Sequence, residues 1–145
     1  MKLRTVFGTA CAAVFLSGAM PVAAHGVGEV VTPHFEQAIP NIPGKSLIAL
    51  LVDYAPGGAS PAHAHAKSAF IFGYVVSGAI ETQVNDGPRR IVRAGESFYE
   101  PPGARHPVSR NASATVPAKL LAVFVVDTND RELTTPDKPY PSHQE

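Results

Sequence analysis

A chain of 145 residues, 45% of them apolar, is long enough to bury the core of one domain and too short for two. Its 12 basic side chains balance its 12 acidic ones, so the net charge gives no reason to expect a nucleic acid or an anionic membrane as a partner. With 14 prolines and 12 glycines, the composition favours short strands joined by turns over helices.

The first 24 residues are predicted to be a secretory signal peptide. Lys2 and Arg4 supply the positive charge that precedes the apolar run of residues 6–20, and the small side chains of residues 22–24 suit signal peptidase. A membrane anchor is the alternative, but the run is short for a span and contains glycine and serine. Cleavage would remove the one cysteine of the chain and deliver a protein without disulfides to the periplasm or the medium.

Residues 25–45, which would begin the mature chain, contain three prolines and little periodicity. We expect an extended N-terminal arm there, which could include an edge strand. Beyond it, runs of apolar, β-branched and aromatic residues recur about every 8 to 12 residues between turn signals, and no window has a sustained helical period. These runs predict strands at residues 47–54, 69–76, 79–84, 89–93, 97–100, 106–110 and 119–126.

This spacing predicts a single all-β domain over residues 46–128, folded as a sandwich or a barrel. Among the turns, residues 85–87 (Asn-Asp-Gly) are a strong hairpin signal, and residues 101–103 (Pro-Pro-Gly) stop a strand abruptly. From residue 129 the chain is polar and proline-rich, so we expect residues 129–145 to form a loose C-terminal tail.

His63 and His65 are the most informative residues for function. Residues two apart on a strand point to the same face, so both imidazoles could reach one metal ion. A third ligand must come from elsewhere, and His106 is the natural candidate because it follows the tight turn at residues 101–103. Three imidazoles would hold one side of the ion and leave positions open for water or substrate. Considered alone, the pair would be better explained as two exposed polar residues.

The spacing around these histidines resembles both sequence motifs of the cupin superfamily, over about residues 47–127. The matching positions are Gly57, His63, His65 and Gly78 for the first motif, and Gly95, Pro101, Gly103 and His106 for the second. The resemblance implies a jelly-roll barrel with a metal ion in its mouth. It also implies a homodimer, since small cupins commonly pair through strands.

The chain departs from the first cupin motif at one position. That motif normally carries a glutamate ligand a few residues after the histidine pair, and here no carboxylate is present. Counting back from Gly78 puts the position at Ile71 or its neighbour Phe70. A site without this negative charge should hold its ion less tightly and favour Fe(II), Zn, Cu or Ni over Mn. The alternative is a vestigial site whose histidines are hydrogen-bonded pocket residues.

Glu100, just before the turn at residues 101–103, is the candidate for the missing acidic group. It could replace the carboxylate ligand, orient a histidine or act as a catalytic base, and the alternative is an exposed charge at a strand end. Tyr99 could line the pocket or fill the core. Arg105 could contact an anionic ligand or lie in solvent.

Two functions follow from this interpretation. The first is a metal-dependent dioxygenase, isomerase or lyase that acts on a small organic molecule, with the metal on His63, His65 and His106. The second is a periplasmic cupin that binds a small ligand or a metal without turnover. The sequence contains neither a nucleophile elbow nor a glycine-rich phosphate loop, and nothing in it suggests nucleic-acid recognition.

Overall fold

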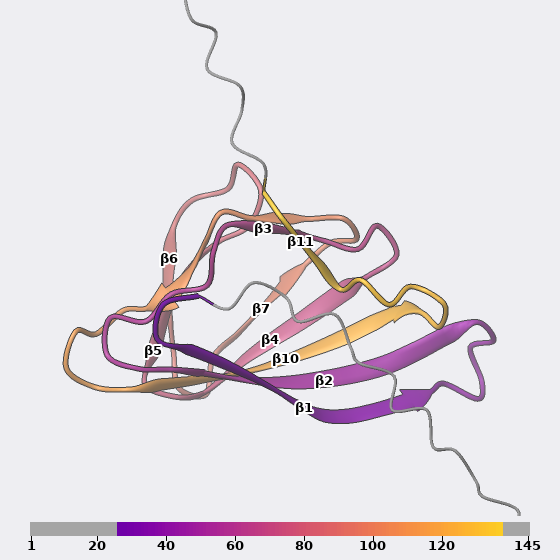
Figure 1. The fold of residues 1–145 in the computed structure, drawn as a ribbon, viewed down its shortest axis with the longest axis horizontal. Coiled ribbons are helices and arrows are strands. Elements are labelled where there is room, and N and C mark those ends of the chain that lie inside the picture. Colours follow the sequence, from indigo (N-terminus) through magenta and orange to yellow (C-terminus); the bar gives the residue numbers. More distant parts are fainter. Residues whose placement is uncertain (1–25, 138–145) are drawn as a thin grey trace, which may run out of the picture.

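The computed structural model describes residues 26–137 (Figure 1). The predicted signal peptide, residues 1–24, and residues 138–145 of the predicted tail lie outside this range. All regular structure in residues 26–137 is β-strand, so the predicted all-β class is confirmed. That part of the chain contains no helix that is long and apolar enough to cross a membrane.

Each of the segments predicted as strands overlaps at least one strand of the structure. The strands within the described residues are β1 (Glu29–Ala38), β2 (Lys45–Tyr54), β3 (His63–His65), β4 (Phe70–Ser77), β5 (Ala79–Gln83), β6 (Arg90–Arg93), β7 (Ser97–Glu100), β8 (Arg105–His106), β9 (Val108–Asn111), β10 (Ala118–Asp127) and β11 (Thr134–Pro136).

Five strands form one antiparallel sheet in the order β1-β2-β10-β4-β7, and Figure 1 shows them side by side. Two three-stranded sheets, β11-β3-β8 and β6-β5-β9, form the rest of the fold. Because only Pro107 separates β8 from β9, the two smaller sheets join there into one bent layer. Strands far apart in the sequence are therefore neighbours, as expected for a jelly-roll barrel.

Side chains that alternate along the strands form the core between these layers. Every second residue of β10 is buried, and β4 has the same alternation. Two apolar clusters result, one that includes Phe98 and one that includes Phe124. The candidate site lies between them, because the ring centroid of Phe98 is 6.1 Å from that of His106 and the centroid of Phe124 is 5.6 Å from that of His65.

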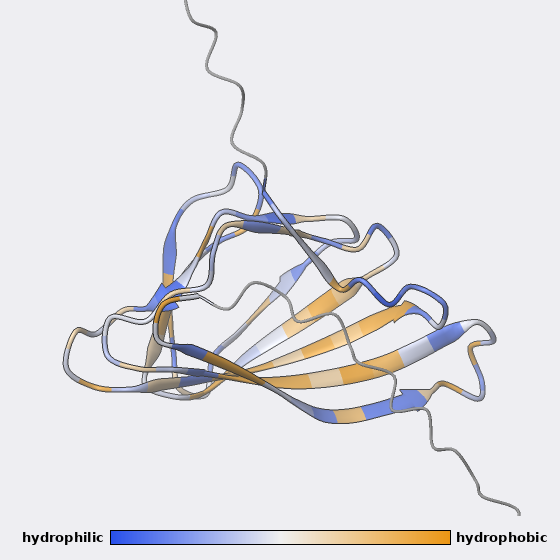
Figure 2. Cartoon of the chain, viewed as in Figure 1, coloured by the Kyte–Doolittle hydropathy of each residue, from blue (hydrophilic) through white to orange (hydrophobic). Residues whose placement is uncertain are grey.

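The outer face of the five-stranded sheet is also apolar. On β4 the side chains of Phe70, Phe72, Tyr74 and Val76 point away from the core and are 37–45% exposed. Figure 2 shows hydrophobic residues along β4, β10 and β2 together. A sheet that packs one face on a core and turns the other to water normally alternates apolar and polar residues, so this outer face is unusually apolar.

The sheets extend beyond the predicted barrel, residues 46–128, at both ends. β1, within the predicted arm, pairs with β2 along its length, with a register shift between Pro33 and Phe35. Most of its side chains are exposed, which explains why the sequence there has little periodicity. β11, within the predicted tail, is a three-residue strand that pairs with β3 and has no counterpart among the predicted strands.

Candidate metal centre

Three histidines meet on the bent layer. His63 and His65 are the two ends of β3, and His106 lies opposite His63 on β8. The ring centroids are 4.8 Å apart for His63 and His65, 5.2 Å for His63 and His106, and 6.0 Å for His65 and His106. One ring nitrogen of each lies within 4.8 Å of the other two, which is close enough for all three to bind one ion. The three ligands predicted from the sequence thus come together.

The turn at residues 101–103 places β8 beside β3. Gly103 has a φ of +71°, a conformation that favours glycine, and its backbone N–H donates to the carbonyl of Ala66. The backbone N–H of His65 in turn donates to the carbonyl of Ala104. These bonds join the end of β3 to the turn before β8, and so bring His106 to the histidine pair.

Backbone carbonyls fix the tautomers of two of the histidines. Nδ1 of His63 lies 2.8 Å from the carbonyl oxygen of Pro61, and Nδ1 of His65 lies 3.3 Å from that of Leu133. A carbonyl only accepts hydrogen bonds, so Nδ1 carries the proton in both rings and Nε2 keeps a lone pair for a metal. His106 is held differently, with its Nε2 2.8 Å from the hydroxyl oxygen of Thr82.

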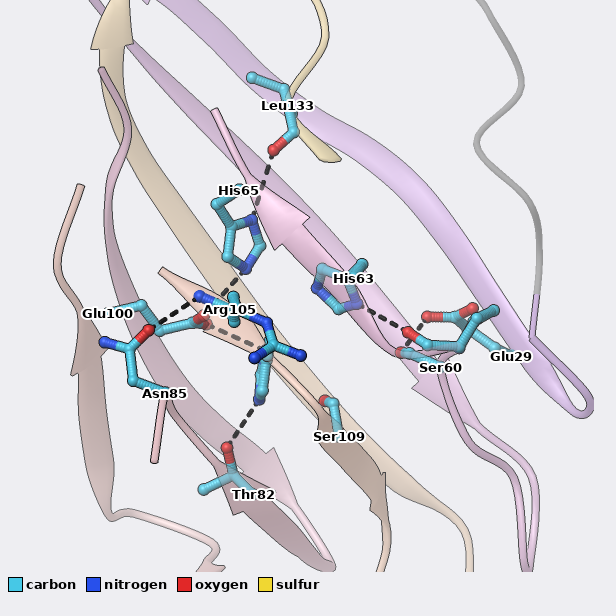
Figure 3. Close-up of polar contacts among 12 residues, drawn as sticks. Glu29, Ser60, His63, His65, Thr82, Asn85, Glu100, Arg105, Ser109 and Leu133 are labelled. Atoms are coloured by element: carbon cyan, nitrogen blue, oxygen red, sulfur yellow. Dashed lines mark hydrogen bonds and ion pairs between the residues drawn. The ribbon is translucent and has the colours of Figure 1, made fainter. Parts of the chain in front are cut away.

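Glu100 is buried in the site and is not the exposed strand-end charge that the sequence left open. Its Oε2 lies 2.9 Å from Nε2 of His65, and its Oε1 lies 3.3 Å from Nδ1 of His106. Figure 3 shows this side chain directed at His65. Glu100 is also the cross-strand partner of Ile71, the inward-facing residue at the glutamate position of the first motif. A carboxylate is therefore present beside that position, on β7 instead of β4.

The contact between His65 and Glu100 tests whether a cation fits the site. Both Nε2 of His65 and Oε2 of Glu100 are buried without a hydrogen-bond partner of acceptable geometry, although they lie 2.9 Å apart. With His65 neutral and its proton on Nδ1, this contact would bring two lone pairs together, which is unfavourable in a buried site. A cation between the two atoms, whether a proton or a metal ion, removes this repulsion, and three imidazoles with one carboxylate are suitable donors for a divalent metal ion.

The protonation states of two of these groups suit metal binding. Burial and the neighbouring His65 lower the pKa of His63 to about 4, so its ring is neutral at pH 7. Burial alone would raise the pKa of Glu100, but the contacts with His106 and His65 outweigh that effect and lower the pKa to about 2. At neutral pH the site therefore holds a neutral imidazole on His63 and an ionised carboxylate on Glu100.

A cavity of about 420 Å³ adjoins the site between the β5–β6 turn and the end of β7. Thr82 belongs both to its lining and to the hydrogen bond with His106. Tyr99 and Pro101, the chain neighbours of Glu100, also line it, as does Arg90. Tyr99 does not fill the core, because it is 62% exposed. The volume is that of a pocket for a small molecule.

Two contacts to the site were not predicted from the sequence. Thr82 lies two residues after Ile80 on β5 and points to the same inner face. A polar residue at a position where an apolar one is expected was the signal that the sequence offered. Leu133 acts through its backbone carbonyl, for which the residue type carries no signal. Arg105, for which the sequence left two roles open, forms an ion pair with Asp137 at 2.6 Å.

Comparison with known proteins gives a family match. The family model described as the cupin domain matches residues 50–124, which is just over half of the chain. A germin-like protein of Arabidopsis thaliana, subfamily 2 member 2, is 31% identical over 102 residues, which cover 68% of this chain and 45% of that protein. The chain therefore spans about half the length of this curated relative.

Solved structures show the same architecture. An oxalate oxidase in complex with the substrate analogue glycolate is 31% identical, with a TM-score of 0.53 over 68% of this chain and 51% of the other. The protein TT1209 from Thermus thermophilus is 26% identical, with a TM-score of 0.55 over 68% of this chain and 83% of the other. Both matches support the fold.

Proposed function

The chain belongs to the cupin family, and on that premise we propose that it binds a divalent metal ion through His63, His65 and His106 and acts on a small organic molecule. The observation that carries this proposal is the buried contact between Nε2 of His65 and Oε2 of Glu100, in which neither atom has a hydrogen-bond partner. A metal ion bound at the site would satisfy both atoms at once, whereas in a vestigial site a proton on His65 would have to do so.

Each residue would have a different role at such a metal centre. A divalent ion held there would supply Lewis-acid or redox chemistry to a molecule bound beside it. His63 offers the lone pair of a ring that stays neutral, because its pKa is about 4. Glu100 offers a negative charge, either as a fourth ligand or as the base that removes a proton from the substrate. Thr82 orients His106 and forms part of the substrate cavity.

Oxidation is the first reaction class to test, because a relative of 31% identity is an oxalate oxidase. Isomerase and lyase activities remain in the same proposal. More metal ions should be tested than the sequence alone suggests. Mn(II) was disfavoured because the first motif lacks a glutamate, but Glu100 brings a carboxylate to the neighbouring position. A carboxylate is a ligand that Mn(II) prefers, so Mn(II) joins Fe(II), Zn(II), Cu(II) and Ni(II) as a candidate.

Metal analysis of the purified protein tests the proposal. The native chain and a His34→Ala control, which changes an exposed histidine on β1 outside the site, should each carry close to one ion per chain. His63→Ala and His106→Ala should lose it. The loaded protein is then assayed for O₂ uptake and product formation with oxalate, glycolate, diketones, flavonols and thiols. A native protein that takes up none of the five ions, when they are added to the apoprotein, would rule the metal site out.

Binding without turnover is the alternative function. The observation in its favour is that the residues lining the cavity include neither a carboxylate nor a histidine that could act as an acid or base. Calorimetric titration that detects metal and ligand binding, with no product after hours of incubation, would support this alternative over an enzyme.

We also propose that the protein is exported and forms a homodimer. Export rests on the signal peptide predicted at residues 1–24, and N-terminal sequencing of protein from the periplasm or medium should then start at His25. The homodimer rests on the apolar outer face of the five-stranded sheet.

A further inference from the structure

The segment of residues 133–137 lies against the histidine pair. Its strand, β11, is antiparallel to β3, with Thr134 opposite His65 and Pro136 opposite His63. Figure 1 shows the two strands crossing the same side of the barrel, although they are about 70 residues apart in the sequence. The C-terminal strand therefore pairs with the strand that carries two of the three candidate ligands.

Leu133 anchors the first end of this segment. Its carbonyl oxygen is 3.3 Å from Nδ1 of His65, and it also accepts a 3.2 Å hydrogen bond from the backbone N–H of Ala66. Its side chain packs against the buried cluster that includes Ile71 and Phe124. The carbonyl is thus held in place by the core on one side and by β3 on the other, and Figure 3 shows it directed at the His65 ring.

Asp137 anchors the other end. Its backbone N–H donates a 2.9 Å hydrogen bond to the carbonyl of Ala62, just before β3. Its carboxylate lies 2.6 Å from the guanidinium of Arg105, the residue before His106. The backbone N–H of Arg105 donates to the side-chain oxygen of Asn85. The segment is therefore fastened to both strands that carry candidate ligands, β3 and β8.

We propose that residues 133–137 are a strap that positions His65 as a metal ligand, with the Arg105–Asp137 ion pair as its clasp. This proposal rests on the metal site described above. The Leu133 carbonyl keeps the proton of His65 on Nδ1 and fixes the plane of the ring, so that Nε2 points at the ion. Leu133, Arg105 and Asp137 are positioning residues, since they act through His65 and β8.

Two truncations of the full chain separate the strap from the residues after it. Removal of residues 133–145 deletes the strap, whereas removal of residues 138–145 leaves it in place and serves as the matched control. Zn(II) affinity is measured by competition with a chromophoric chelator. It should fall about 10- to 100-fold in the first variant and stay unchanged in the second, because partners that orient a ligand histidine have effects of this size.

The tautomer of His65 provides a readout that needs no metal and that a merely structural role would not move. In ¹⁵N spectra of the metal-free protein, His65 should be a single Nδ1–H tautomer in the native chain and in the variant without residues 138–145. The variant without residues 133–145 should show a mixture. If it keeps both the tautomer and the Zn(II) affinity of the native chain, the strap proposal is wrong.

The clasp is tested by Asp137→Asn, which also serves if the longer truncation does not fold. An exposed ion pair contributes little stability, so Zn(II) affinity should fall only about two- to fivefold. Asp127→Asn is the control, because it removes a 2.6 Å ion pair with Lys45 away from the histidines and should leave affinity unchanged. Equal affinities for the two variants would overturn the role of the clasp. If the native chain binds no Zn(II) or other ion, the metal site fails, and the tautomer alone then decides on the strap.

Discussion

Glu100 occupies a position that the sequence alone made ambiguous. Its cross-strand partner, Ile71, takes the place of the glutamate in the first motif, and residues directly opposite in a sheet have Cβ atoms only about 5 Å apart. A carboxylate on β7 can therefore reach the space that a carboxylate on β4 would have filled. Glu100 thus supplies a carboxylate directly across the sheet from the position at which the first motif carries its glutamate.

Glu100→Gln should separate metal affinity from the stability of the metal-free protein. Metal affinity should fall about 10- to 100-fold, because a neutral amide is a poorer donor than a carboxylate. The free energy of unfolding of the metal-free protein should not fall, because the amide can donate a hydrogen bond to Nε2 of His65, which Glu100 cannot. Metal titration and urea unfolding measure the two effects. A large loss of stability in the metal-free variant would contradict the repulsion inferred between His65 and Glu100.

The pKa of Tyr54 predicts how the stability of the protein changes at alkaline pH. Burial raises its pKa to about 12, while the hydrogen bonds with Ser109 and Ser60 oppose the shift only in part. A phenol whose pKa is higher in the folded state stabilises the protein below pH 10, and the contribution is lost as the pH rises from 10 to 12. The free energy of unfolding should fall by about 3 kcal/mol over this range. Urea unfolding between pH 8 and pH 12 measures it.

Tyr54→Phe is the comparison for this prediction. The variant loses the hydrogen bonds to Ser60 and Ser109 at every pH, so its stability is lower at pH 8, but it has no phenol to ionise. Its stability should therefore decline less steeply than that of the native protein between pH 10 and pH 12. Parallel curves for the two proteins would show that Tyr54 does not titrate as proposed.

At the scale of elements, two glycines with the same backbone requirement lie in turns with different consequences. Gly103 precedes β8 and has a φ of +71°, and Gly44 precedes β2 and has a φ of +81°. Gly103→Ala would place Cβ no closer than 3.5 Å to another atom, and Gly44→Ala would place it in open space. Each substitution should therefore lower the free energy of unfolding by only the energy of a left-handed backbone conformation at alanine, about 1–2 kcal/mol.

Only Gly103→Ala should also weaken metal binding, by about tenfold, because the turn at residues 101–103 sets the position of His106 against β3. Thermal unfolding should report similar losses for the two variants, and metal titration should report a loss for Gly103→Ala alone. If Gly44→Ala weakens metal binding equally, the effect reflects general stability and not the placement of β8.

The strands could be predicted from the sequence because their signals are local. The continuous aliphatic run of β10 and the turn signals at residues 85–87 and 101–103 depend on neighbouring residues only. The roles of Glu100 and residues 133–137 depend on which strands pair and in what register, and neither appears in the sequence. The three histidines are the intermediate case, because their spacing matches motifs whose fold brings them together.

At the scale of the whole molecule, the apolar outer face of the five-stranded sheet predicts a homodimer. Phe72 lies near the middle of β4 on this face, and the ion pair between Lys119 and Asp53 gives the face a charged end. The substitution Phe72→Glu would place a charge in the centre of such an interface and raise the dissociation constant of the dimer about 30-fold or more.

Light scattering after size-exclusion chromatography, over a range of concentrations, measures the mass. The native protein should have the mass of two chains and Phe72→Glu that of one. Ile91→Glu is the matched control, because Ile91 is 51% exposed on β6, outside this sheet, and its substitution should leave the mass unchanged. If Phe72→Glu leaves the dimer intact and Ile91→Glu dissociates it, the interface lies on the β6-β5-β9 sheet instead. A native protein that is monomeric at every concentration would rule out the homodimer.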